Sequence, residues 1–427
     1  MSYRNAGVAV AVLSLLASAG FAFAADGTAS TAAPQMSIAP TPLTLDAASY
    51  GPLMTGLDQL GLASPIDKAG FNIYGWIEAG YTYNTRNSQY SSAYESQRVY
   101  PGAFNPQVTN SVDLNSVSIV FQRKVDSSKG TFDVGGKVWV SYGTDSDFTK
   151  SNGMQIYAGV DQVSPTYQFD FPEAYVDVAV PVKGLSFRAG KFATLIGYES
   201  LDPTQGNPFY SRSWLYSLEP ITQTGVLAMY TLNDQWSFTG GVTRGWDQAL
   251  KDNNGSPDFL GQAVFTLNKQ WAFTLNSSVG PEDTGDTSHY RILLDPIATF
   301  QATDKLKLAA EGLYVQDGGL QGAAPTVTHA YGDYYGGAVY ASYALNDMFT
   351  LNARGEIIHA YTHPTSADVY EATLGVTITP MPKDKILSNL SIRPEVRYDA
   401  SSQPIFATPV NNWNNQLTFA ADVIMKF

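Results

Sequence analysis

The sequence predicts an all-β chain, folded as a transmembrane, antiparallel, up-and-down β-barrel of about sixteen strands with short periplasmic turns and long outer loops. The first observation behind this is the alternation in the final segment, 416–427. One face of that segment carries Leu417, Phe419, Ala421, Val423, Met425 and Phe427. The other face is polar except for Ile424. A period of two is typical of a strand, and the length suits a bilayer crossing of roughly 9–11 residues. Taken alone, the segment fits the last strand of a soluble sandwich equally well.

The second observation is the alternation of short and long connections. Strands are expected near 71–81, 112–123, 131–142, 170–180, 185–193, 224–232, 235–246, 259–267, 270–280, 289–301, 305–316, 332–344, 348–360, 369–379, 385–398 and 416–427. Tight-turn residues join four pairs of them, at Asn233-Asp234, Asn268-Lys269, Thr303-Asp304 and Asn346-Asp347. Long connections are expected near 84–111, 143–169, 194–223, 247–258, 281–288, 317–331, 361–368 and 399–415. All tight turns then lie at one end, as in outer-membrane barrels and unlike a Greek-key sandwich.

Composition agrees with a barrel. Of the 427 residues, 44% are apolar and only 15% charged. After the N-terminus no apolar run reaches the roughly 18 residues of a membrane-spanning helix. The sequence has no Cys, which excludes disulfides, thiol chemistry and thiolate metal sites. A net charge of -13 argues against nucleic acid as a partner.

The N-terminal segment predicts export. Arg4, the apolar stretch 6–17 and the cleavage pattern Ala22-Phe23-Ala24 predict a signal peptide over residues 1–24, since the stretch is too short for an anchor. Residues 25–70 are expected to form a periplasmic lead-in. Within them, residues 51–62 are interpreted as a linker in preference to helical turns forming a partial plug. The barrel is expected over 71–427.

Charges within the strands keep mostly to one face. In the fifteenth strand Ile386, Leu390, Ile392 and Val396 oppose Asn389, Ser391, Arg393, Glu395 and Arg397. Arg or Lys facing lipid would cost about 2–4 kcal/mol at the midplane, so the charged face is expected to point inward. The second strand is ambiguous, and the tenth has apolar residues on both faces. Aromatic residues expected at headgroup level are Tyr81, Tyr83, Trp236, Trp271, Tyr340, Tyr343, Tyr361 and Trp413.

Sixteen strands would enclose an aqueous channel. The expected pore-lining residues are Lys137, Glu173, Asp177, Arg188, Arg291, Lys307, Glu311, Arg354, Glu356, Arg393, Glu395 and Arg397. Rings of charge in a pore select ions. The alternative is equally open: neighbouring opposite charges on a strand simply pair with each other and do not contact permeant ions. Examples are Arg354 with Glu356 and Arg393 with Glu395.

The connection from Thr194 to Gln223 is the longest of the expected outer loops. A loop beyond about 12–15 residues tends to be functional or disordered, and its aromatic content argues against disorder. We expect it to fold into the lumen as a constriction, with a cap on the outer surface as the alternative. The constriction residues would be Tyr198, Glu199, Asp202, Arg212, Trp214 and Glu219.

Three sequence blocks resemble one known family. They are the stretch from Gly75 to Tyr81, the stretch from Gly190 to Glu199, and Asn207 to Arg212 together with Leu218 to Gly225. They are similar to the β-barrel porin family of OmpL-like type, over roughly 71–427, with the middle block the most specific. The resemblance implies an outer-membrane location in a Gram-negative type envelope and a pore. It implies no particular solute.

The expected function is therefore passive diffusion of small hydrophilic solutes or ions through an outer-membrane porin. The alternative is a structural or adhesive barrel without an open pore. An enzyme is disfavoured, because a barrel lipase needs a Ser–His pair on the lipid side, and Ser277 has outward parity while His289 has inward parity. No cofactor and no metal site are expected.

The expected partners follow from the membrane location. They are outer-membrane lipid and lipopolysaccharide, the small solutes, and the barrel-assembly machinery. Phe427 is the terminal aromatic residue of the expected assembly signal, which the barrel-assembly machinery would recognise. The sequence leaves the oligomeric state open, with a homotrimer as one candidate.

Overall fold

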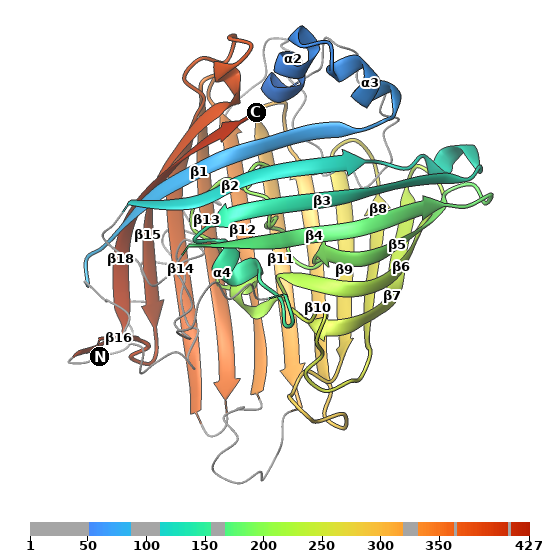
Figure 1. Cartoon of the computed structure of the whole chain (residues 1–427). Helices are drawn as coiled ribbons and strands as arrows, with labels where there is room; N and C mark the ends of the chain where they lie inside the picture. Colours follow the sequence, from blue (N-terminus) through green and yellow to red (C-terminus); the bar gives the residue numbers. More distant parts are fainter. Residues whose placement is uncertain (1–50, 87–111, 155–166, 319–331, 363–364, 409–410) are drawn as a thin grey trace, which may run out of the picture.

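The computed structural model describes residues 51–86, 112–154, 167–318, 332–362, 365–408 and 411–427. Within these ranges sixteen strands form one closed barrel, in which every strand pairs antiparallel with its sequence neighbour and β1 (Asn72–Asn84) closes against β18 (Asn415–Lys426). Figure 1 shows this wall running continuously around the molecule. The predicted fold class and strand number are confirmed.

The other strands of the wall lie close to the predicted segments. They are β2 (Val112–Arg123), β3 (Asp133–Gly143), β4 (Gln168–Ala179), β5 (Leu185–Ala193), β6 (Thr222–Thr231), β7 (Trp236–Trp246), β8 (Asp258–Thr266), β9 (Trp271–Gly280), β10 (Arg291–Gln301), β11 (Leu306–Asp317), β12 (Gly332–Ala344), β13 (Phe349–Thr362), β14 (Thr365–Ile378) and β15 (Leu390–Ser401). A separate hairpin of β16 (Phe406–Thr408) and β17 (Asn411–Trp413) lies in the connection between β15 and β18.

The C-terminal strand closes the barrel as its alternation predicts. Phe419 and Val423 are exposed on the outer face, whereas Asp422 and Ile424 are buried inside. Phe427 extends the ladder, because its backbone N–H and C=O each hydrogen-bond to Gly75 at 2.9 Å. A Cβ at Gly75 would collide with the Phe427 ring, so this close approach explains the glycine.

Two expected boundaries are wrong. The long connection at 361–368 is mostly strand, because the pairing of β13 with β14 continues to Thr362 opposite Thr365. The fifteenth strand begins at Leu390 instead of 385. The carboxylate of Asp384 accepts hydrogen bonds from the Ile386 and Leu387 N–H groups, both at 2.8 Å, and this holds the preceding segment in a turn.

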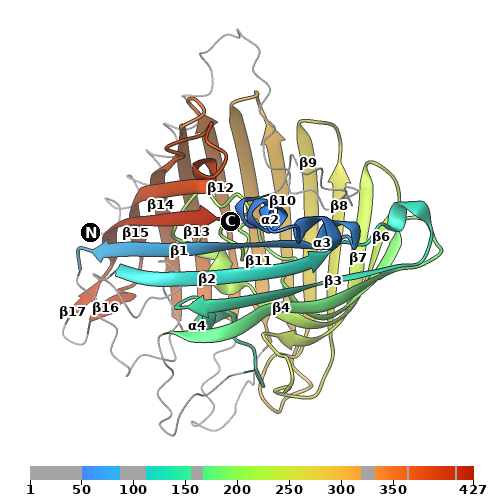
Figure 2. The same ribbon diagram turned by 45° about the horizontal axis from the view of Figure 1, so that its top comes forward.

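The segment before β1 is helical, which agrees with the helical turns considered as the alternative for 51–62, while its role as a linker or a partial plug stays a prediction. It forms α2 (Pro52–Gln59) and α3 (Ala63–Lys68), with Pro at the start of α2, where its missing N–H has no cost. Figures 1 and 2 show both helices at the barrel end that also carries the C-terminus. No helix in the described ranges is both long and apolar enough to cross a membrane. The expected signal peptide and residues 25–50 lie outside those ranges.

Outward aromatic rings gather near the tight-turn end of β7 to β10. Trp236 stacks on Phe265 at a centroid distance of 4.4 Å, and Trp271 stacks on Phe300 at 4.2 Å. Tyr340 does not belong to this outer set. It is buried inside the barrel, with its ring 4.5 Å from that of Tyr198, because it shares the inward parity of Ala338.

Candidate pore and its internal loop

The connection between β5 and β6, residues 194–221, lies inside the barrel. The Gly197 N–H donates to Asp295 of β10 at 2.7 Å, and the Tyr210 N–H donates to Glu395 of β15 at 2.9 Å. The Tyr210 hydroxyl then reaches Asn115 of β2 at 3.1 Å. Since β2 and β10 belong to separate parts of the closed wall, the loop crosses the lumen.

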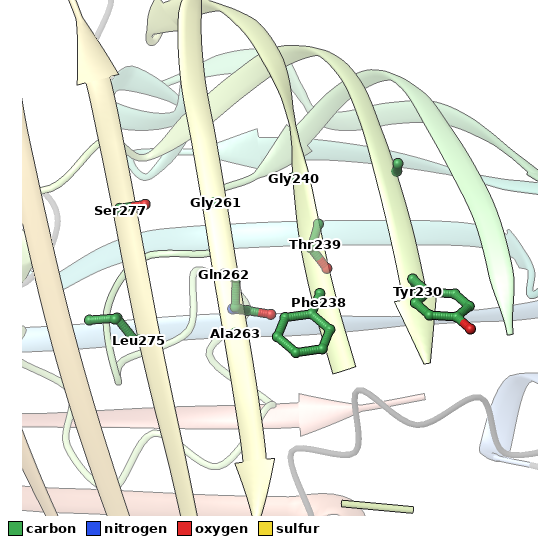
Figure 3. A pocket seen from close by; sticks show the side chains of 10 residues that line it. Tyr230, Phe238, Thr239, Gly240, Gly261, Gln262, Ala263, Leu275 and Ser277 are labelled. Carbon is green, nitrogen blue, oxygen red and sulfur yellow. The ribbon is translucent and has the colours of Figure 1, made fainter. Parts of the chain in front are cut away.

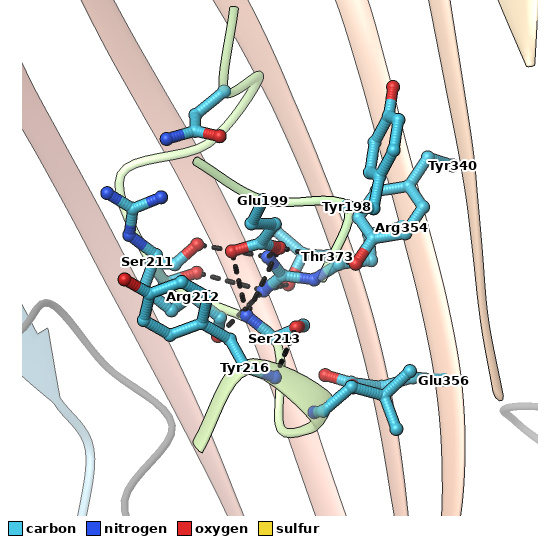
Figure 4. A network of polar contacts seen from close by, with 12 residues as sticks. Tyr198, Glu199, Ser211, Arg212, Ser213, Tyr216, Tyr340, Arg354, Glu356 and Thr373 are labelled. Carbon is cyan, nitrogen blue, oxygen red and sulfur yellow. Dashed lines mark hydrogen bonds and ion pairs between the residues drawn. The ribbon is translucent and has the colours of Figure 1, made fainter. Parts of the chain in front are cut away.

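Arg354 of β13 is the centre of the network that holds this loop. Its side chain is fully buried and lies between two carboxylates, with Nη1 2.8 Å from Glu199 of the loop and Nε 3.1 Å from Glu371 of β14. Nη1 also donates to the Ser211 carbonyl at 3.0 Å. Figure 4 shows the guanidinium surrounded by loop groups. One charge therefore joins two strands to the loop.

Carboxylates of the wall accept hydrogen bonds from the loop backbone. Glu356 of β13 accepts from the N–H groups of Trp214, at 2.8 Å, and Leu215, at 3.3 Å. Glu395 accepts from Ser211 as well as from Tyr210, and Glu311 of β11 accepts from Tyr198 at 2.9 Å. Hydrogen bonds from these three wall side chains to successive parts of the loop backbone fix the path of the loop.

The arginines of β15 hold loop carbonyls. Arg393 pairs with Asp422 of β18 at 2.5 Å and donates to the Asn207 carbonyl at 2.7 Å. Arg397 pairs with Asp399 at 2.9 Å and donates to the Arg212 carbonyl at 2.5 Å. Both arginines are buried.

The other predicted pore-lining charges pair between adjacent strands. Asp177 of β4 accepts two hydrogen bonds from Arg188 of β5, at 2.8 and 2.9 Å. The remaining pairs are Lys137 with Glu173, and Arg291 with Asp317 at 2.6 Å. Lys307 differs: in the described residues it has no carboxylate partner, and its Nζ lies 5.6 Å from the centre of the Tyr198 ring.

The pairings considered from sequence, Arg354 with Glu356 and Arg393 with Glu395, do not occur in the described residues. Arg354 pairs instead with Glu199 of the loop and Glu371 of β14, and Arg393 pairs with Asp422 of β18. A spacing of two residues along one strand face does not itself prevent pairing, since Arg397 pairs with Asp399 at that spacing. Four of the carboxylate partners, Glu78, Glu371, Asp399 and Asp422, were missed, although their inward parity was a usable signal. Asp295, which accepts from the Gly197 N–H, was missed as well.

Other predicted loop residues shape the loop itself. Asp202 accepts hydrogen bonds from the backbone N–H and hydroxyl of Thr204, at 2.8 and 2.7 Å. Arg212 donates to the Ser200 carbonyl at 2.6 Å, so Asp202 and Arg212 give the loop a defined internal fold. The Trp214 indole instead ties the loop to the wall, because it donates to Asp399 of β15 at 2.9 Å.

Glu219 is the least satisfied of the loop acids. Its carboxyl group is buried beside that of Glu311, with which it can share a proton, and no N–H or hydroxyl group of the described residues donates to either oxygen. Burial, followed by the negative charges of Glu311 and Asp295, raises the pKa of Glu219 well above its ordinary value. The side chain packs against Gly197, where a Cβ would collide with the Glu219 carboxylate and where a φ of 92° also favours glycine.

An apolar cluster also joins the loop to the wall. Ile196 and Leu215 of the loop are buried together with Leu227, Leu260 and Leu293, which point inward from β6, β8 and β10. This explains why the tenth predicted strand carries apolar residues on both faces. The inward apolar side chains of β6, β8 and β10 therefore lie where the wall contacts the loop.

Solved structures similar to this chain are outer-membrane proteins. OmpT of Vibrio cholerae in its trimer form has a TM-score of 0.52 at 11% identity, covering 84% of this chain and 99% of that one. The outer-membrane channel DcaP of Acinetobacter baumannii has a TM-score of 0.51 at 13% identity, covering 84% and 98%. OprB of Pseudomonas putida has a TM-score of 0.52 at 10% identity, covering 87% and 97%. At these identities the likeness concerns the fold.

A comparison with curated protein sequences found no match. The profile of the family described as putative beta-barrel porin-2, OmpL-like, matches residues 70–427, and the chain therefore belongs to that family of outer-membrane barrels.

Proposed function

We propose that this outer-membrane porin allows passive diffusion of small hydrophilic solutes or ions, and that the loop at 194–221 forms its constriction. The observation that supports this proposal is the position of the loop. It crosses the interior of a sixteen-strand barrel and is anchored there by Arg354, Glu356 and Glu395. A barrel of this size leaves an aqueous channel unless something fills it. We infer no catalytic role for it.

One observation favours a second candidate, a structural or adhesive barrel that is closed. The charges nearest the loop are fully or almost fully buried, with 0% of the Arg354 side chain and 1% of the Arg397 side chain exposed. Permeant ions could not touch them without movement of the loop. The two candidates therefore differ in whether a water-filled path remains beside the loop.

Planar-bilayer recording of the purified protein separates them. A porin is expected to give discrete, reproducible conductance steps as single proteins insert. The folded state of the sample is verified by its heat-modifiable mobility on a gel. The absence of any conductance step in many bilayers that receive this folded protein would support the closed barrel.

Lys307 provides a test of ion selectivity. Because it is the pore-lining candidate without a carboxylate partner in the described residues, we expect Lys307→Glu to shift the reversal potential toward cation preference. Lys305→Glu makes the same change of charge in the exposed turn before β11 and serves as the control. Equal shifts in the two variants would show that Lys307 does not face the ion path.

The proposal extends to the partners expected from sequence. OmpT is described in a trimer form, which supports a homotrimer for this barrel of similar fold. Phe427 would serve as the signal for the barrel-assembly machinery, and outer-membrane lipid with lipopolysaccharide would surround the wall. The mass of the detergent-solubilised protein, measured by light scattering, tests the oligomeric state.

A further inference from the structure

The two arms of the internal loop meet at one place on the wall, between β10 and β11. In the first arm, the Gly197 N–H donates to Asp295 of β10 at 2.7 Å. The next N–H, that of Tyr198, donates to Glu311 of β11 at 2.9 Å. In the second arm, Glu219 packs against Gly197, with its carboxyl group beside that of Glu311. These five residues form the loop neck, in which the wall offers carboxyl groups to both arms.

Asp295 receives two hydrogen bonds that favour its ionised form. Besides the loop N–H, the side-chain amide of Asn276 on β9 donates to it at 2.8 Å. The orientation of Asn276 is fixed in turn by Gln262, labelled on β8 in Figure 3, whose amide donates to the Asn276 oxygen at 2.8 Å. Since hydrogen bonds to the charged form of a carboxyl group favour that form, Asp295 is an acceptor in the loop neck.

Glu311 and Glu199 are acceptors as well. Glu311 accepts from the Tyr340 hydroxyl of β12 at 3.2 Å, in addition to its hydrogen bond from the loop. Glu199 accepts from Arg354 at 2.8 Å and from the Ser213 N–H at 3.2 Å, both within the network of Figure 4. Three carboxyl groups at or beside the loop neck thus have donors that suit their charged forms.

Glu219 has no such donor among the described residues. Only 6% of the residue is exposed, and no N–H or O–H of the described residues reaches either carboxyl oxygen. A buried charge without a partner is so costly that the group neutralises instead. Burial and the neighbouring acids accordingly raise the pKa of Glu219 well above its ordinary value. A protonated Glu219 has one O–H to donate, and the adjacent acceptor is Glu311.

The other titratable groups around the loop neck leave this proton in place. They are three tyrosines and three cations of the loop and of β11 to β13: Tyr198, Tyr216, Tyr340, Arg212, Lys307 and Arg354. Burial raises the pKa of the two loop tyrosines, so both stay neutral where carboxyl groups titrate. The two arginines are bound to other loop groups, and Lys307 lies 5.6 Å from the centre of the Tyr198 ring. Within the described residues, none of the three cations forms an ion pair with Glu219.

We propose that one proton, shared by Glu219 and Glu311, holds the loop neck together, and that its loss at alkaline pH loosens the neck and raises the conductance of the pore. Loss of the proton to water removes the O–H to carboxylate hydrogen bond and leaves two adjacent negative charges, which repel each other. The loop stays attached to β5 and β6, because the Thr194 N–H donates to the Ile221 carbonyl at 3.1 Å. This regulation rests on the proposed porin function and concerns the same loop.

Single-channel recording of the purified full chain at a series of pH values tests the proposal. Wild-type conductance is expected to rise about twofold or more from neutral to alkaline pH, over about two pH units as the loss of one proton requires. Glu219→Gln should keep the low conductance at every pH, because its amide N–H replaces the shared proton as the donor to Glu311. Glu311→Gln should do the same, because its amide can donate to Glu219.

Glu282→Gln is the matched control. Glu282 also lies beside another acid, Asp258, and accepts from the Trp246 N–H at 3.1 Å. It has no contact with the loop at 194–221 in the described residues, since its partners belong to β7 and β8. The conductance of this variant should therefore rise with pH as that of the wild-type protein does.

Several results would overturn the proposal. A wild-type conductance that is present but independent of pH would exclude the proton switch and leave the porin function standing, whereas the absence of conductance at every pH would overturn both. An equal loss of pH dependence in Glu219→Gln and Glu282→Gln would contradict the assignment to the loop neck. A rise in conductance caused by a chelator at constant pH would identify a divalent cation in place of the proton. Heat-modifiable gel mobility confirms that each variant is folded.

Discussion

Replacing Arg354 with alanine is expected to destabilise the barrel by about 3–5 kcal/mol and to increase single-channel conductance. The guanidinium is fully buried and pairs with Glu199 at 2.8 Å and with Glu371 at 3.1 Å. Its removal leaves both carboxylates buried without their cation and removes the donor to the Ser211 carbonyl. The loop should then leave the wall of β13 and β14 and widen the path.

Arg291→Ala is the matched control for this experiment. Arg291 is also an inward arginine paired with one acid, Asp317, but its side chain is 21% exposed and it makes no contact with the loop in the described residues. We expect a loss of about 1 kcal/mol or less and an unchanged conductance. The thermal midpoint of the gel-mobility shift and bilayer recordings provide the two measurements. Equal effects of the two substitutions would contradict the anchoring role of Arg354.

The barrel could be predicted because the patterns that specify its strands and turns each lie within a short segment of the sequence. Alternation along 416–427 assigns Phe419 and Val423 to lipid without knowledge of any other strand, and a period of two makes the pairing register strongly specified. Turn chemistry is equally local. At Asn233, Asn268 and Asn346 the side-chain oxygen caps the turn by accepting backbone N–H groups, such as that of Trp236 at 2.8 Å. Residue type was therefore enough to place these turns.

The loop contacts were not predictable, since they join residues far apart in sequence. The sequence indicated that Arg354 and Glu356 point inward, but Arg354 pairs with Glu199 and Glu371, and Glu356 accepts from Trp214. Which inward charge meets which loop group depends on the path of the loop across the lumen. Tyr340 was misplaced for a related reason, since its aromatic character suited the interface while its parity placed it inside.

Replacing Glu219 with glutamine is expected to make the stability of the protein less dependent on pH. Burial and the charges of Glu311, Asp295 and Glu199 raise the pKa of Glu219 in the folded protein, so folding favours its protonated form. Its contribution to stability is fully present below the unfolded pKa of about 4.3 and is lost as pH rises through the raised folded pKa. Each unit by which the folded pKa exceeds the unfolded one is worth about 1.4 kcal/mol.

Wild-type stability should therefore fall as pH rises from the unfolded pKa of about 4.3 through neutral pH into the alkaline range, and the Glu219→Gln variant, which has no proton to lose at this position, should fall less. The thermal midpoint of the gel-mobility shift across this range measures both slopes. Asp384→Asn is the control, because hydrogen bonds from the Leu387 and Ile386 N–H groups lower the pKa of Asp384, which confines its effect to acid pH. Parallel slopes for the wild-type protein and Glu219→Gln would mean that Glu219 is ionised inside the barrel, so that a cation beside the loop would have to balance it.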